Sequence, residues 1–272
     1  MWGGGMAAKP TKADLVDFDE LTKTELEEML AGGEIVIQSH RILAKTEDNI
    51  VGEILKDQGT FYEWNHYPDG DIYDFETHSQ YYYHAHPPEE RSGEHGHFHT
   101  FLRPDGMPPG ITPALVPDFK MPEDEDDALS HLAGVSMDQK GLPIKLFTTN
   151  RWVTGEVWYT AKDVSRLLNY FNIDLAHPSW PVNRWITGMV TLFRPQIREL
   201  LYMRDVAVAA WQEKYPDDSV YEDRNLEVTS EMEVDIDGQI QAVTAALGAR
   251  KGKTKKPAAK PAKKPAKKKA SG

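Results

Sequence analysis

Histidines are concentrated in one short part of this chain, where their spacing could support metal chemistry. Seven of the ten histidines lie between residues 66 and 103. Five of them fall on alternating positions in two runs separated by a turn-forming segment, residues 87–94: His84, His86, His95, His97 and His99. Because successive side chains of a β-strand point to opposite faces, each run predicts a strand with its histidines on one face. If the runs pair as an antiparallel hairpin, five imidazoles share that face.

Imidazoles on one face of a hairpin are typical of a transition-metal site. Cross-strand neighbours have Cβ atoms about 5 Å apart, which lets two rings reach one ion at about 2.0–2.1 Å. The central ligand candidates are His84, His86, His97 and His99, with His95 and His78 as reserve or supporting ligands. The expected cofactor is a divalent transition metal, and imidazole ligation alone does not choose among zinc, iron and copper.

Three further side chains near the histidines are candidates for catalysis. Tyr82 lies between the histidine columns and can donate a hydrogen bond or take part in redox chemistry. Glu76 and Glu94 can supply a carboxylate ligand or a general base. A metal with an open position activates water for hydrolysis or binds dioxygen for oxidation, so a metal-dependent hydrolase or oxidoreductase is expected.

Other interpretations of the histidine face stay open. A non-enzymatic metal-binding or sensing module would use the same ligands. A metal-free phosphate site would use Arg103 and Arg151 as substrate-binding groups. The histidines could also form a pH-responsive cluster with tyrosines, or lie incidentally on a solvated face. The H-x-H-x3-E spacing resembles the first ligand motif of cupin metalloproteins, which implies a ligand set of His84, His86 and Glu90.

Composition excludes several other classes of site. The 272 residues include no cysteine, which rules out disulfides, thiolate metal sites and cysteine nucleophiles. A hydrophobic fraction of 40% is enough for a core. Neither a signal peptide nor an apolar stretch of membrane-spanning length is visible, so a cytoplasmic protein without membrane contact is expected.

The C-terminal segment has the opposite charge to the rest of the chain. Residues 251–272 hold ten of the 31 basic residues and no acid, so the preceding part carries 21 basic against 43 acidic residues, a formal charge of −22. This segment resembles the Lys/Ala/Pro tails of linker histones and some bacterial nucleoid proteins. The resemblance implies a partner that is nucleic acid or another polyanion, bound without sequence preference. A solubilising tail, or one that folds back on the acidic part, is the alternative.

The remaining pattern predicts an α+β fold, a mainly antiparallel sheet that carries the His-rich hairpin and is packed by C-terminal helices. Strands are expected at residues 60–67, 131–137, 143–149, 156–159 and 226–234, with a type I turn at 67–70. Helices are expected from a capping box at Thr22 and Glu25 to Gly32–Gly33, over 34–45, after Thr160, and over 236–247. The expected domain is residues 21–249, between disordered ends at 1–20 and 250–272.

Three motifs in this sequence are long enough to suggest a family. They are His66-Tyr-Pro-x-Gly-Asp71, Tyr81-Tyr-Tyr-His-x-His86 and Glu94-His-Gly-His-Phe-His99. Together they resemble a group of uncharacterised bacterial proteins that share a domain of unknown function, and the resemblance covers roughly residues 25–248. It implies no activity, so the expected chemistry depends on the residues themselves.

Overall fold

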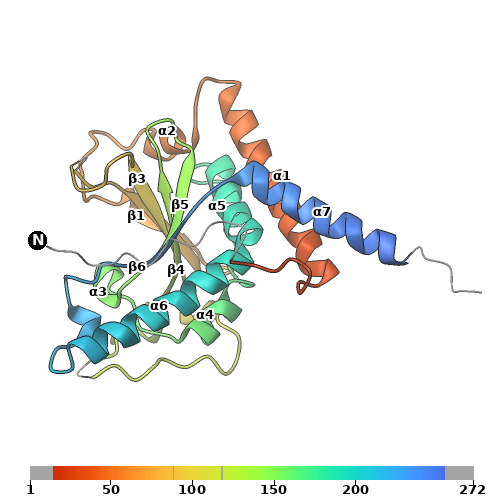
Figure 1. Ribbon diagram of the computed structural model, residues 1–272. Coiled ribbons are helices and arrows are strands. Elements are labelled where there is room, and N and C mark those ends of the chain that lie inside the picture. Colours follow the sequence, from red (N-terminus) through yellow and green to blue (C-terminus); the bar gives the residue numbers. More distant parts are fainter. Residues whose placement is uncertain (1–14, 88, 118, 255–272) are drawn as a thin grey trace, which may run out of the picture.

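The computed structural model, which describes residues 15–87, 89–117 and 119–254, is built on a six-stranded antiparallel sheet. The strands lie side by side in chain order, and Figure 1 shows the sheet together with the surrounding helices. They are β1 (Tyr67–Asp74), β2 (Ser79–His84), β3 (Gly96–Leu102), β4 (Ser130–Met137), β5 (Pro143–Thr149) and β6 (Val228–Glu233). The predicted α+β class and the His-rich hairpin, which is β2–β3, are confirmed.

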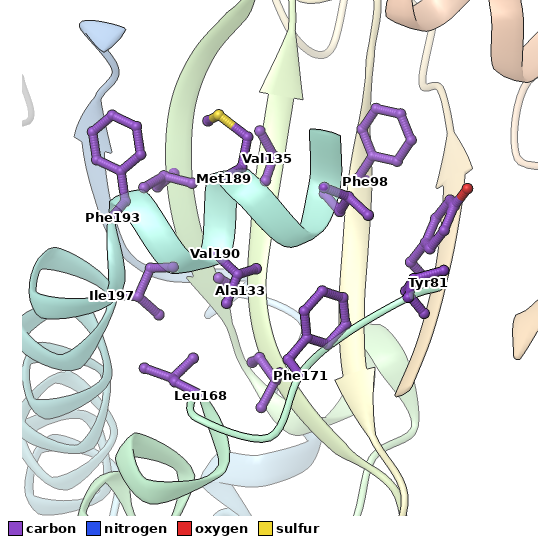
Figure 2. Close-up of a cluster of buried hydrophobic side chains, with 14 of the residues drawn as sticks. Tyr81, Phe98, Ala133, Val135, Leu168, Phe171, Met189, Val190, Phe193 and Ile197 are labelled. Atoms are coloured by element: carbon purple, nitrogen blue, oxygen red, sulfur yellow. The ribbon is translucent and has the colours of Figure 1, made fainter. Parts of the chain in front are cut away.

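The described α-helices are α1 (Lys23–Ala44), α2 (Ile50–Leu55), α3 (Arg151–Thr154), α4 (Ala161–Leu167), α5 (Trp180–Leu192), α6 (Arg194–Lys214) and α7 (Ile236–Thr254). Helices α4, α5 and α6 pack on one face of the sheet and build the main core, whereas α7 packs on α1. Figure 2 shows Met189 of α5 next to Val135 of the sheet, with Phe171 and Ile197 in the same buried cluster. Each such buried side chain contributes about 1.5–3 kcal/mol, which holds the helix layer on the sheet.

The strand period divides the hairpin residues between the two faces of the sheet. Tyr81 of β2 and Phe98 of β3 point to the helix layer, and the Tyr81 hydroxyl donates to Asn183 of α5 at 2.5 Å. Their neighbours in sequence therefore point to the opposite face, which carries the histidines. Three short helical turns also lie between the main elements: η2 (Pro104–Gly106), η3 (Glu125–Asp127) and η4 (Val220–Glu222), of which η4 packs against α6.

Helix α1 begins as the sequence predicts but does not end where expected. Thr22 and Glu25 form the capping box, with the Glu25 N–H donating to the Thr22 hydroxyl at 3.1 Å. The helix then continues through Gly32–Gly33 to Ala44. A Cβ on Gly32 would lie 3.0 Å from the Gly188 carbonyl oxygen of α5. Here glycine allows two helices to approach closely, and this packing outweighs its low helix propensity.

Several predicted strand boundaries are wrong. Residues 60–66 are irregular, and the expected turn at 67–70 is instead the start of β1. Pairing of β1 with β2 shifts between Tyr67 and Ile72, and the bulge contains a cis peptide before Pro68. Because β1 is an edge strand, it tolerates a proline without an N–H group. Residues 156–159 are not a strand, whereas those at 131–137, 143–149 and 226–234 are confirmed with small shifts.

The ends of the chain are described in part. Residues 1–14 and 255–272, which contain most of the two segments predicted to be disordered, lie outside the described residues. Helix α7 reaches Thr254, beyond the predicted domain end at residue 249. None of the described helices combines the length and the apolar composition that a bilayer-spanning segment needs.

Candidate metal centre

Three histidines meet on the face of the sheet that is opposite the helices. The register of β2 with β3 places His84 directly across from His97 and Tyr82 across from His99. One ring nitrogen from each of His84, His97 and His99 lies within 4.8 Å of the other two. These side chains are 9%, 1% and 0% exposed, respectively, so the cluster is shielded from solvent.

The outer ring nitrogens of two of these histidines are already hydrogen-bonded. His97 Nδ1 lies 2.6 Å from Glu94 Oε1, and His99 Nδ1 lies 3.0 Å from His131 Nε2. The Nε2 atoms are therefore left for the cluster. His84 Nε2 and His97 Nε2 are 2.6 Å apart, and His99 Nε2 is buried with no hydrogen-bond partner among the described residues. Such an unsatisfied buried nitrogen needs an explanation.

Burial keeps these imidazoles neutral. It lowers the pKa of His84 to about 3 and the pKa values of His97 and His99 well below the usual value, with the neighbouring imidazoles adding to the effect. A neutral imidazole has a free lone pair on one nitrogen, which is the form that binds metals. The protonation state is therefore the one required for ligation across the neutral pH range.

The donor set fits a transition-metal ion. Two imidazole nitrogens on one tetrahedral ion are about 3.3 Å apart, so small rotations of His84 and His97 from their present 2.6 Å would open the site. Glu94 accepts from the far side of His97, an arrangement that fixes the ring orientation of metal-binding histidines. Gly134 contributes indirectly, because a Cβ there would lie 2.3 Å from the Phe147 ring, which packs 5.2 Å from His97.

Two residues behind the cluster were not expected from the sequence. His131 of β4 bonds His99, and its own backbone N–H donates to Glu156 Oε2 at 2.7 Å. Burial lowers the pKa of His131 to about 3 and raises the pKa of Glu156 to about 8. Glu156 Oε1 has no hydrogen-bond partner in the described part of the chain. The predicted strand at 131–137 included His131, but a shift in the β3–β4 register between Thr100 and Phe101 brings it to His99.

Two of the predicted site residues, His86 and Tyr82, lie at the rim of the cluster. His86 follows the end of β2, and its ring lies 5.1 Å from that of His84 and 5.2 Å from that of His97. Its Nδ1 is 3.3 Å from Glu90 Oε2, so the cupin-like trio is only partly assembled. The Tyr82 ring is 5.2 Å from that of His99. Burial raises the pKa of Tyr82, so its hydroxyl stays protonated.

His66 is a further rim residue that was not predicted as a site residue. Its ring stacks on Tyr82 with a centroid distance of 3.6 Å and an interplanar angle of 9°. Its Nδ1 lies 2.9 Å from Asp71 Oδ1, and Asp71 also accepts from the Gln80 amide at 2.8 Å. The H-Y-P-x-G-D motif is the sequence signal that could have indicated this pair.

Three other predicted site residues do not join the cluster. His95 precedes β3, and its Nδ1 lies 2.6 Å from the hydroxyl of Tyr83, a residue of the helix-facing set. His78 lies in the β1–β2 turn, where one of its ring nitrogens groups with carboxylate oxygens of Asp105 and Asp126. Glu76 is exposed in the same turn. Strand ends explain these positions, because the alternation of side chains holds only inside a strand.

The two predicted substrate-binding arginines are both paired with carboxylates. Arg103 donates to Asp127 at 2.7 Å and to the Gln80 side-chain oxygen at 2.7 Å. Arg151 donates to Glu222 and to the Glu156 carbonyl oxygen. Among the described residues, no hydrogen bond joins either arginine to the three histidines, and the charges of both arginines are largely offset by these acids.

Comparison with known proteins places the chain in a family. The model of the family described as domain of unknown function DUF6969 matches residues 30–234. The chain belongs to this family. The DUF6969 segment contains all six strands and therefore the whole histidine cluster, whereas α7 lies outside it. No curated protein and no solved structure matches the chain.

Proposed function

We propose that this DUF6969 protein is a metalloenzyme that holds one divalent transition-metal ion with His84, His97 and His99. The observation that carries the proposal is the convergence of three buried, neutral imidazoles, one nitrogen of each within 4.8 Å of the others. The unpartnered His99 Nε2 supports it, because a metal would satisfy that nitrogen.

Hydrolysis or hydration is the chemistry that this site supports best. Three neutral histidines do not reduce the positive charge of the ion, and in a tetrahedral site they leave one coordination position open. Zinc sites of this kind lower the pKa of a bound water to about 7. Glu94 orients His97 and His131 orients His99. The aromatic rings of Tyr82 and Phe147 exclude bulk water from the same face, which strengthens electrostatic interactions with a substrate.

Oxidation is the second candidate, and one observation favours it. Tyr82 is buried, and its ring contacts those of His84 and His99 at 5.5 and 5.2 Å. A phenol at this distance can exchange an electron with a redox-active iron or copper. The identity of the bound metal separates the two reactions, because zinc has no redox chemistry in proteins.

Metal analysis of the purified protein tests the proposal. We expect about one equivalent of zinc, iron or copper in the wild type and none in the His84→Ala/His97→Ala double variant, because two of three ligands are lost. His78→Ala is the matched control and should keep its metal, since His78 lies in the β1–β2 turn outside the three-histidine cluster. Circular dichroism checks that each variant folds.

A metal-free wild type would contradict the proposal. The relevant result is protein that stays without metal after growth in supplemented medium and gains no thermal stability from zinc, copper or iron. Binding at 100 times the Kd would add about 2.7 kcal/mol to the free energy of unfolding, a shift that is easily measured. Metal bound with equal affinity by the wild type and the double variant would place the ion elsewhere.

We further propose that residues 251–272 bind a polyanion, such as nucleic acid. The support is the charge pattern, with ten lysines in a segment that follows a region of formal charge −22. Such an arm would tether the metal domain to an anionic polymer without reading its sequence.

A further inference from the structure

The irregular segment before β1 reaches the rim of the histidine face through Trp64 and His66. This aromatic strap, residues 61–66, contacts the hairpin through three rings. Phe61 lies 5.7 Å from the ring of His95, Trp64 lies 4.1 Å from that of His86, and His66 stacks on Tyr82. The strap therefore covers the rim of the metal centre on the side toward which the three histidines project.

Hydrogen bonds fix the backbone of the strap at several points. The Tyr62 N–H donates to the Tyr67 hydroxyl at 2.6 Å, and that hydroxyl donates to the Tyr62 carbonyl oxygen at 3.1 Å. The Trp64 N–H donates to the Ala85 carbonyl oxygen at 2.9 Å. The backbone angle φ of Trp64 is 69°, a left-handed conformation that bulky residues rarely adopt. These contacts hold the strap in one conformation, although it has no regular secondary structure.

The strap nevertheless exposes large aromatic side chains. Tyr62 is 60% exposed and Trp64 is 53% exposed. Aromatic rings on a fixed backbone offer a large contact area to a ligand at a small cost in conformational entropy. The ring centroid of His86 lies 4.1 Å from that of Trp64 and 5.1 Å from that of His84. The Trp64 and His84 centroids are therefore at most about 9.2 Å apart. A small molecule with two linked rings can span that distance.

We propose that the aromatic strap is the substrate-recognition element of the metal centre. A flat aromatic ring of a small ligand stacks on Trp64, while a nitrogen or oxygen of the same ligand reaches the metal. The ligand is small because the three histidines are at most 9% exposed, which leaves no room for a polymer to reach them. This inference rests on the proposed function, since the second anchor is the metal ion.

Binding of imidazole and 4-phenylimidazole to the cobalt-loaded protein tests the proposal. Cobalt(II) replaces zinc in such sites and absorbs visible light, so each probe is titrated through the change in the cobalt spectrum. Imidazole reports the open metal position alone, and the phenyl group adds the ring that the strap would stack on. We expect 4-phenylimidazole to bind at least about threefold to tenfold more tightly than imidazole, as aromatic pairing predicts.

A substitution in the strap then locates the effect. In Trp64→Ala the preference for 4-phenylimidazole should fall toward onefold, while the Kd of imidazole changes by less than about twofold because the metal ligands are untouched. Phe75→Ala is the matched control, since Phe75 is 78% exposed in the β1–β2 turn at the opposite end of β2 from His84. It should keep the full preference.

The outcomes separate the two proposals. Imidazole binding without any preference for 4-phenylimidazole, or a preference that survives Trp64→Ala, overturns the recognition role and leaves the metal centre standing. Cobalt uptake without a response to imidazole overturns the open position and the recognition role together. A protein that takes up no cobalt overturns the proposed function itself.

Discussion

Replacing Glu94 should weaken metal binding through His97, although Glu94 is not itself one of the three ligands. Glu94 Oε1 lies 2.6 Å from His97 Nδ1, and His97 is 1% exposed, so no water can readily take over this contact. Loss of such a supporting carboxylate typically lowers metal affinity about 10- to 100-fold, or about 1.4–2.7 kcal/mol. Glu94→Gln keeps an acceptor and should fall near the lower limit. Glu94→Ala leaves Nδ1 unpaired and should fall near the upper limit.

Competition with a chromophoric zinc chelator at pH 7.5 measures these differences. Glu90→Gln is the matched control, because Glu90 also approaches a histidine, His86, but at 3.3 Å and with its side chain 49% exposed. Its loss should change the zinc Kd by less than about threefold, since exposed charge pairs contribute little. Urea unfolding of the metal-free proteins checks that the variants are equally folded.

Two results would refute this reasoning. Equal losses in Glu94→Gln and Glu90→Gln would show that the effect is one of general charge and not of ring orientation. Wild-type affinity in Glu94→Ala would show that His97 is not a ligand oriented by Glu94. Either result would remove the orienting role of Glu94 and leave the three-histidine ligand set to be tested by the His84→Ala/His97→Ala variant.

Two other predictions concern regions outside the ligand set. Burial raises the pKa of Glu156 from 4.5 to about 8, so between these values the folded protein holds a proton that the unfolded chain releases. As the pH rises from 5 to 8, the free energy of unfolding of the wild type should therefore fall relative to that of Glu156→Gln, by up to about 1.4 kcal/mol per pH unit. Urea unfolding measures both proteins, and a difference between them that does not change with pH would contradict the raised pKa. Removal of residues 255–272, which include eight of the ten tail lysines, should leave metal content unchanged and strongly weaken binding to duplex DNA. Binding of the intact chain should fall with salt at a log–log slope of about −0.9 per phosphate neutralised, and equal binding by both chains in filter assays would place the contact in the folded part.

The local pattern of residues predicted the faces of the hairpin correctly. His84, His97 and His99 share one face and Tyr81 and Phe98 the other, because alternation depends only on the geometry of a single strand. Helix starts were predictable for the same reason, since a cap joins residues that are three positions apart in the chain.

Features that depend on neighbouring segments were missed or misplaced. The strap was predicted to be a strand, and His95 was placed on the histidine face although it bonds Tyr83. Strands end where their partners stop offering hydrogen bonds, and this is not encoded in the run of residues itself. His131 and Glu156 were missed because they come from β4 and the segment after β5, and even His131 lies 32 residues after its partner His99 in the chain.

The chain's composition and spacing settle which chemistry is available, namely imidazole ligation without thiolates on one face of an antiparallel hairpin. Only the packed structure decides which histidines converge and how strongly they resist protonation. Ligand geometry depends on the β2–β3 register, and the low pKa values depend on burial of the rings and on the neighbouring imidazoles. Both are properties of neighbours in space, because the free energy of a charged ring is determined by what surrounds it and not by its position in the sequence.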